Sequence, residues 1–276
     1  MFCPLKMAMI RGADDLEPEA MEANYPMATL PATPDYVLSV IQDGHRQACE
    51  YDSGTDPWAV LSYDTTVSEW RYVCDLVSWR SLGRALNDMW GIRCSDAEWR
   101  AVLEPARQRT VRDVCNLIAG RAVRPAIQPA TVLGKKCAAA GAFLTVRSLL
   151  GKAGASADAI APSTELAPYT RQHLDVFLGG VSRLAPGVLP PVKIQKPVYD
   201  AGVTVIVLGM TCLIVGFAGL YVFTIAGVLL FTVGFALTWF AARRTPLSVE
   251  FGELRTFRDL AILLADGSSD GQSRYA

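Results

Sequence analysis

The chain has 276 residues and a net charge of −1, with its hydrophobic residues concentrated in one block. A charge so near zero gives no support for a nucleic-acid-binding protein, and the length is that of about two domains. The seven cysteines are scattered without a Cys-x-x-Cys pair, which argues against a disulfide framework and for a reducing compartment.

Residues 1–33 are expected to form a flexible acidic tail, because carboxylates are clustered there and large apolar residues are few. Pro4, Lys6 and Arg11 interrupt the continuous apolar core that a secretory signal peptide needs. The part of the chain ahead of the hydrophobic block is therefore expected to stay in the cytoplasm.

Residues 34–120 are predicted to form a first helical module. Apolar residues recur at helical spacing in Asp35–Cys49, and the strongest amphipathic pattern covers Trp70–Trp90. A loop rich in Gly, Asp and Pro separates these two segments. The pattern predicts a long first loop between helices.

Two shorter helices are predicted from their N-terminal caps. Ser95 precedes Glu98 by three residues, as in a capping box. Thr110 precedes Asp113 by the same distance, and an acidic side chain there also favours the positive end of a helix. The first module is thus expected to contain four helices, with a short third one.

This order of elements resembles the acyl carrier protein fold. The segment Trp90–Asp96 (Trp-Gly-Ile-Arg-Cys-Ser-Asp) is similar to that family's Phe-Gly-Ile-x-Ile-Pro-Asp turn, and Thr110–Val114 is similar to the opening of its last helix. The resemblance covers residues 34–120. It implies a four-helix bundle that carries phosphopantetheine on the serine of an Asp-Ser-Leu sequence at the start of the second helix.

The chain departs from the family at this serine. Counting back from the turn places Asp75 at the family's Asp and Leu76 at its Ser, and a leucine cannot form the phosphodiester. Ser78 is two residues further on, a rotation of about 200° on a helix, so it is expected to face away. The resemblance therefore implies a carrier fold without carrier chemistry. Ser78, and Thr170 in the second module, are the alternative attachment positions.

A basic segment follows the first module. Residues 121–138 are predicted to be a linker, and the stretch Arg100–Lys136 holds eight basic residues against two acidic ones. In a membrane-tethered protein such a stretch can lie against anionic headgroups. One alternative is a solvated face with a basic linker. A nucleic-acid surface is the other, and no reading motif accompanies the charge.

An eleven-residue segment occurs twice in the chain. Arg109–Ala119 and Arg255–Ala265 are identical at six of eleven positions. Pro162–Leu166 likewise corresponds to Tyr63–Val67. Because the second copy of the eleven-residue segment lies behind the hydrophobic block, the second module is predicted to be interrupted by that block.

The second module is assigned to residues 139–197 and 245–266, with residues 267–276 as a flexible tail. Helices are predicted at Ala139–Leu150 and Thr170–Leu184. The C-terminal helix is expected to pack on these helices across the insertion, through Phe257, Leu260, Leu263 and Leu264.

The hydrophobic block, Ala201–Ala242, has forty-two residues without a charge. As one helix it would be about 63 Å long, about twice the hydrocarbon core of a bilayer. A two-helix transmembrane hairpin is therefore predicted within residues 198–244, with its turn at Tyr221–Val222. A re-entrant loop that does not fully cross is the alternative. Both termini are placed on the cytoplasmic side of an inner membrane by basic residues at both ends of the block: Lys193, Lys196, Arg243 and Arg244.

Glycines at a spacing of seven predict how the hairpin packs. With that turn, Gly216 faces Gly227 and Gly209 faces Gly234, and small residues let helix backbones approach closely in lipid. No ionisable side chain lies inside the block, which argues for an anchor rather than a transporter or channel.

No catalytic, metal or cofactor site is expected. His45 and Cys49 lie four apart on a predicted helix, and the simpler interpretation of this pair is a surface histidine beside a half-buried thiol. Zinc-ligand spacings, phosphate-binding loops and the GxSxG motif do not occur. The helical spacing of the tryptophans predicts core packing rather than an aromatic binding surface: Trp58, Trp70, Trp79, Trp90 and Trp99.

These features predict an all-α, bacterial-type membrane protein that acts as a non-enzymatic scaffold or adaptor. Its expected partners are the lipid bilayer and unidentified proteins, with oligomerisation left open. One alternative is a carrier or accessory subunit of membrane-associated acyl or lipid metabolism. A second alternative is a membrane-perturbing effector.

Overall fold

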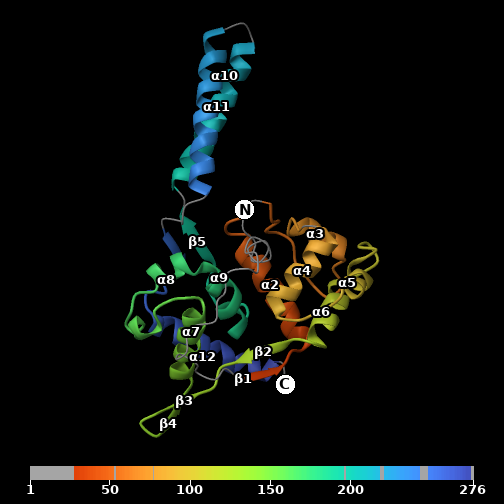
Figure 1. Ribbon diagram of the computed structural model, residues 1–276, viewed down its shortest axis with the longest axis vertical. Helices are drawn as coiled ribbons and strands as arrows, with labels where there is room; N and C mark the ends of the chain where they lie inside the picture. Colours follow the sequence, from red (N-terminus) through yellow and green to blue (C-terminus); the bar gives the residue numbers. More distant parts are fainter. Residues whose placement is uncertain are drawn as a thin grey trace. The chain divides into compact units, whose positions relative to one another are not determined.

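A computed structural model describes residues 28–52, 54–76, 78–195, 197–217, 221–242 and 248–274. These residues are mostly helical, as expected for the all-α class, and they also form short two-stranded sheets (Figure 1). The chain divides into two compact units. One consists of the residues up to Val192 and those from Glu250 onward, and the other is Lys193–Val249.

The first module contains a bundle of short helices around an apolar core. Its large core side chains are less than 2% exposed, and they include Trp70, Trp99 and Ile118. Trp70 and Trp99 are core residues, as their spacing predicts. The same prediction is wrong for Trp58, which lies in the loop between α2 and α3 and is 90% exposed. The helices are α2 (Pro34–Ala48), α3 (Val67–Val73), α4 (Trp79–Trp90), α5 (Asp96–Leu103) and α6 (Val111–Ala119).

The caps predicted for the two shorter helices are confirmed. Ser95 and Glu98 form a reciprocal capping box at the start of α5. At the start of α6 the Thr110 N–H donates to the Asp113 carboxylate at 2.9 Å. Each cap satisfies backbone donors that a helix start leaves without an intrahelical acceptor, so both helices begin where the sequence places them.

The amphipathic stretch Trp70–Trp90 is divided between two helices, so the described part of the first module has five helices where the sequence predicts four. α3 ends at Val73, and Asp75 then adopts a left-handed backbone with a φ of 45°. The Leu76 N–H donates to the Arg71 carbonyl at 2.8 Å, which is the hydrogen bond of a Schellman helix end. Because an aspartate tolerates the left-handed region better than most residues, the sequence shows no glycine to announce this break.

Short strands occupy segments that the sequence predicts to be tail and linker. β1 (Ala28–Pro31) lies inside the predicted tail, and it pairs antiparallel with β2 (Val123–Ala126) of the predicted linker. β3 (Ala130–Val132) and β4 (Lys135–Cys137) form a tight hairpin. Each strand has only three or four residues, which is too few for a period-of-two pattern to be recognised.

The second module begins with α7 (Ala138–Lys152), close to its predicted bounds. The single helix predicted at Thr170–Leu184 is wrong, because the chain there forms several short helical turns. The wide turn η2 contains Gly179 and Gly180, and paired glycines favour such distortions. The turns are α8 (Ala167–Gln172), α9 (Leu174–Val176), η2 (Phe177–Val181) and η3 (Ser182–Leu184).

Helix α12 (Phe257–Arg274) follows the hairpin in sequence and packs on α7. Phe257, Leu260 and Leu264 are no more than 1% exposed, whereas Leu263 is only half-buried. The Phe257 ring lies edge-on to Tyr169, with ring centroids 5.2 Å apart. The helix continues to Arg274, so most of the predicted tail at 267–276 is helical.

In the first module, the start of α3 is held against the start of α6 by backbone pairing. Thr66 and Thr110 form an antiparallel bridge. Such a pairing fixes the two helix starts side by side, although they are far apart in sequence. The N–H groups donate from Val67 to the Arg109 carbonyl (2.8 Å), from Val111 to that of Thr65 (2.9 Å) and from Arg112 to that of Tyr63 (3.1 Å).

The same pattern of backbone pairing occurs in the second module, on either side of the hairpin. Glu165 and Thr256 form the bridge. The hydrogen-bond donors and acceptors are the residues that correspond to those of the first module. The N–H groups donate from Leu166 to the Arg255 carbonyl (2.9 Å), from Phe257 to that of Thr164 (3.2 Å) and from Arg258 to that of Pro162 (2.8 Å).

The hydrophobic block forms two helices, α10 (Pro197–Phe217) and α11 (Tyr221–Ala242). The segments Val198–Gly216 and Phe223–Ala241 each have a mean hydropathy of 2.0 and are long enough to cross a membrane. Only 11% of each segment is buried within the protein, whereas a core helix of a soluble protein would be mostly buried. The apolar side chains of both helices therefore point outward.

Two strands flank the hairpin and pair with each other. They are β5 (Val192–Gln195) and β6 (Ser248–Phe251). Lys193 lies exposed on β5. The other three basic residues predicted to set the topology, Lys196, Arg243 and Arg244, lie outside the described residues.

The four glycines predicted to pack the hairpin, Gly209, Gly216, Gly227 and Gly234, all lie where the two legs approach each other. A side chain at any of them would overlap the backbone of the facing leg. A Cβ on Gly209, for example, would lie 2.7 Å from the Phe231 nitrogen. The facing residues are Phe231 for Gly209, Thr224 for Gly216, Leu213 for Gly227 and Ile206 for Gly234.

The predicted pairing of these glycines is wrong. Gly216 does not face Gly227, and Gly209 does not face Gly234. The reason is the position of the turn, because α11 already begins at Tyr221, where the sequence places the turn itself. Moving the turn toward the N-terminus shifts the register, so that a Cβ on Gly227 instead meets the Gly209 carbonyl, at 2.9 Å.

Candidate functional site

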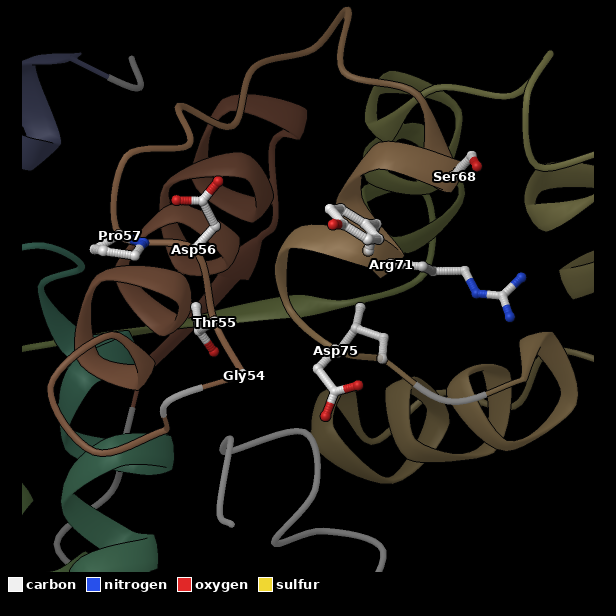
Figure 2. A pocket seen from close by; sticks show the side chains of 9 residues that line it. Gly54, Thr55, Asp56, Pro57, Ser68, Arg71 and Asp75 are labelled. Atoms are coloured by element: carbon white, nitrogen blue, oxygen red, sulfur yellow. The ribbon is translucent and has the colours of Figure 1, made fainter. Parts of the chain in front are cut away.

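A cavity of about 960 Å³ lies at the C-terminal end of α3 in the first module (Figure 2). One wall comes from the loop that follows α2, and the other from α3 and the turn after it. Its lining mixes one cation, two carboxylates and several hydroxyl groups. The lining residues are Gly54, Thr55, Asp56, Pro57, Ser68, Arg71, Tyr72, Asp75 and Leu76.

The loop that forms the first wall is held in place by its backbone. The Asp56 N–H donates to the Val73 carbonyl at 2.9 Å. The Gly54 N–H donates to the carboxylate of Asp52, a residue only 2% exposed, at 3.1 Å. A Cβ on Gly54 would lie 3.3 Å from Asp75, so a larger residue would push the two walls apart.

Two buried polar atoms, one in each wall, are without a hydrogen-bond partner among the described residues. They are the hydroxyl of Thr55, a residue 5% exposed, and the Arg71 Nε. The Arg71 Nη1 lies 3.6 Å from the Glu104 carboxylate. Neither the Thr55 hydroxyl nor the Arg71 Nε is accessible to solvent, so neither is available to a molecule in the cavity. The lining residues of the cavity include no histidine.

The positions implied by the carrier-protein resemblance lie beside this cavity. Leu76 lines it. Ser78 is the exposed residue just before α4, and its hydroxyl lies 3.4 Å from that of Ser81. Ser78 lies just ahead of α4 rather than inside a helix, so the helical rotation used for that expectation does not apply at this position.

Thr170, the second alternative attachment position, is closed off. Its side chain is 1% exposed, and its hydroxyl donates to the Ala167 carbonyl at 3.0 Å. A phosphodiester at this oxygen would require the module to open. Thr170 is a structural residue that satisfies its hydrogen bond within α8.

His45 and Cys49 lie close together, and Cys49 is half-buried as expected. The expectation that His45 is a surface residue is wrong, because it is buried at 9% exposure. The Cys49 sulfur is 3.7 Å from the His45 Nε2, and the same nitrogen lies 3.0 Å from the Asp56 carbonyl. Since a carbonyl only accepts, Nε2 must carry its proton there and cannot take one from the thiol. Burial, followed by the charge of Glu50, raises the pKa of the Cys49 thiol, which disfavours a thiolate. No metal-binding cluster of His, Cys, Asp or Glu occurs in the described part of the chain.

The basic stretch Arg100–Lys136 is partly neutralised by ion pairs. Arg112 lies 3.1 Å from the Asp64 carboxylate, and Arg121 pairs with Glu98. Hydrogen bonds from Arg121, and then from Ser95, lower the pKa of the Glu98 carboxyl to about 2. The two lysines of β4 are exposed at the β3–β4 hairpin. The stretch is therefore not one continuous basic face.

A polar contact between the modules was not expected from the sequence. The Asp43 carboxylate on α2 is 2% exposed, accepts from the Ser182 hydroxyl and pairs with Arg46. The Gln47 side chain accepts from the Val192 N–H at 2.9 Å. Arg183 donates to the Met89 carbonyl at 2.6 Å. In the sequence, this contact could have been recognised only from two polar residues, Asp43 and Gln47, on the buried side of α2.

A search of family models found none that matches the chain, and neither curated proteins nor solved structures gave a match.

Proposed function

We propose that this protein is a non-enzymatic, membrane-anchored scaffold of bacterial type. The α10–α11 hairpin is the anchor, and it holds the helical unit on the cytoplasmic face of an inner membrane. The observation that supports this most is the outward-facing apolar surface of both legs, because it would be unstable in water and stable in lipid. The close glycine contacts between the legs support the same conclusion.

The anchored unit consists of two carrier-protein-like modules, the second interrupted by the anchor. The matched backbone pairings at Thr66–Thr110 and Glu165–Thr256 support this proposal, because they join corresponding positions of the two copies. A hairpin returns the chain close to its starting point, so it can be inserted there at little entropic cost.

Contact with a partner protein is supported by exposed apolar residues beside the cavity. Trp58 is 90% exposed, Val60 87% and Tyr72 84%. Aromatic residues of this kind are enriched at protein interfaces, where they supply a large contact area. The first module thus offers a surface for binding, while its core tryptophans serve the fold.

The anchoring is tested by replacing residues 197–242 with a short Gly-Ser linker. The full chain is expected in the membrane fraction after alkaline carbonate extraction, and the variant is expected in the soluble fraction. The far-ultraviolet circular dichroism spectrum of the variant should still be that of a folded helical protein. A full chain that alkaline extraction releases would contradict the anchor. Binding is tested with Trp58→Ala and Tyr72→Ala, which should lose co-purifying protein in the native host, whereas Ile262→Ala should retain it.

The carrier alternative is supported by the exposure of Ser78 ahead of α4. It predicts the addition of one phosphopantetheine when the chain is co-expressed with a phosphopantetheinyl transferase, measured as intact mass. Ser78→Ala is the matched control and should abolish the addition. The scaffold proposal predicts an unmodified chain in both cases.

A further inference from the structure

The β3–β4 hairpin ends in a two-residue turn of unusual composition. Val132 pairs with Lys135, and both residues between them have a positive φ, 50° at Leu133 and 77° at Gly134. Two such residues define a type I′ turn, whose first central position favours Asn, Asp or Gly. Leucine has no short polar side chain to stabilise a left-handed backbone, so the turn is strained at Leu133.

This strain is not offset by packing within the protein. Leu133 is 99% exposed, and the neighbouring Val132 is 46% exposed. Figure 1 shows the hairpin projecting from the first unit beyond α7. An apolar side chain at the tip of a projecting turn is placed for a contact outside the chain.

The base of the hairpin is firmly attached to the second module. Gly141 of α7 lies so close to Gln128, just before β3, that a Cβ would overlap the Gln128 carbonyl oxygen. β4 leads directly into α7, where the Cys137 sulfur accepts from the Ala140 N–H at 3.4 Å. The tip is therefore presented in a fixed position, and its binding requires little further ordering.

The charge around the tip determines what it can contact. Lys135 and Lys136 follow the turn directly and are exposed. No Asp or Glu occurs in the sequence between Asp113 and Asp158. An apolar residue next to two lysines matches the boundary of an anionic bilayer, where the side chain enters the acyl region and the ammonium groups stay among the phosphates.

We propose that the β3–β4 tip docks on an anionic lipid surface, with Leu133 and Val132 inserted and Lys135 and Lys136 on the headgroups. The inference rests on the proposed anchoring, because a chain tethered to a bilayer meets lipid at a high effective concentration. Of the basic stretch Arg100–Lys136, only the tip residues Val132, Leu133, Lys135 and Lys136 would then contact the lipid.

The test uses the full chain reconstituted into nanodiscs of phosphatidylcholine alone or of phosphatidylcholine mixed with phosphatidylglycerol. Amide hydrogen exchange of residues 130–137 is compared by mass spectrometry. Exchange at the tip is expected to be at least about tenfold slower in the anionic discs than in the discs of phosphatidylcholine alone. High salt should reduce this difference, because it screens the attraction between the lysines and the phosphates. Leu133→Asn and the double variant Lys135→Gln, Lys136→Gln should lose this protection, whereas Val60→Asn, which removes an exposed apolar residue elsewhere, should keep it.

Leu133→Asn separates docking from folding. Because Asn suits the first position of a type I′ turn, this variant should unfold at the same or a higher temperature while it loses the protection. Equal exchange in both lipid compositions, or protection that persists in Leu133→Asn, would overturn the proposal. A chain that fails to enter discs of either composition would instead refute the anchoring, so the two failures are distinguishable.

Discussion

Replacing Phe257 by Ala tests whether the second module is one fold interrupted by the hairpin. The Phe257 side chain is 1% exposed and packs edge-on against Tyr169, which lies ahead of the hairpin in sequence. Truncating a buried Phe to Ala costs about 3–5 kcal/mol. If the residues on both sides of the hairpin unfold together, the open state of the whole module becomes about 10²- to 4 × 10³-fold more populated.

Limited proteolysis of the full chain in detergent micelles measures this effect in residues 139–190, which contain no part of the substituted helix. Cleavage within α7 should accelerate by a factor of that size in Phe257→Ala. The matched control is Ile262→Ala, on the same helix but 48% exposed, which should leave the rate unchanged. Truncation after Arg244 should give the largest acceleration. Unchanged protease resistance of residues 139–190 in both Phe257→Ala and the truncated chain would refute the interrupted-module reasoning.

Three further outcomes follow from named contacts. Gly227→Leu should separate the legs of the hairpin, because even a Cβ there would lie 2.8 Å from the backbone of the facing leg. It should lower the thermal unfolding midpoint in detergent far more than the control Val228→Leu, because the Val228 side chain is 50% exposed. The pKa of the Glu98 carboxyl is lowered to about 2 in the folded state. The stabilisation by this carboxylate is therefore complete above its ordinary pKa of 4.5 and is lost as the pH falls toward 2. In Glu98→Gln, circular dichroism should show a thermal unfolding midpoint that depends less on pH within that range. Asp43→Ala leaves the Ser182 hydroxyl without its acceptor, so it should cost about 1–3 kcal/mol and speed amide exchange in η3 and α2 together.

The parts of the fold that were predictable from the sequence are those with a local chemical signature. The Ser95–Glu98 box marks the start of α5 because both partners lie within one helical turn. The hydrophobic block predicts α10 and α11 because hydropathy and length depend on composition alone. The correspondence of Pro162–Leu166 with Tyr63–Val67 was visible because each segment precedes its copy of the eleven-residue segment and has threonine at its third position.

The features that escaped prediction depend on contacts between distant residues or on the backbone. The break at Asp75 uses a left-handed aspartate where a glycine would have been recognisable. The glycine register in the hairpin depends on a turn whose position a featureless apolar sequence does not specify. The buried Asp43 and its Ser182 partner lie 139 positions apart, and no single-sequence pattern connects them.

Labelling of intact cells with a membrane-impermeant thiol reagent tests the anchored topology most directly. Single cysteine reporters are placed at Ser53, at Ser268 and, in the sequence between α10 and α11, at Gly219. The unsubstituted chain is the control for labelling of its own thiols. The anchored-scaffold account predicts labelling at Gly219 only, with Ser53 and Ser268 shielded until the cells are permeabilised. Labelling of Ser53 or Ser268 in intact cells would contradict the account, and a Gly219 reporter that is shielded in intact cells would show that the hairpin does not cross the membrane.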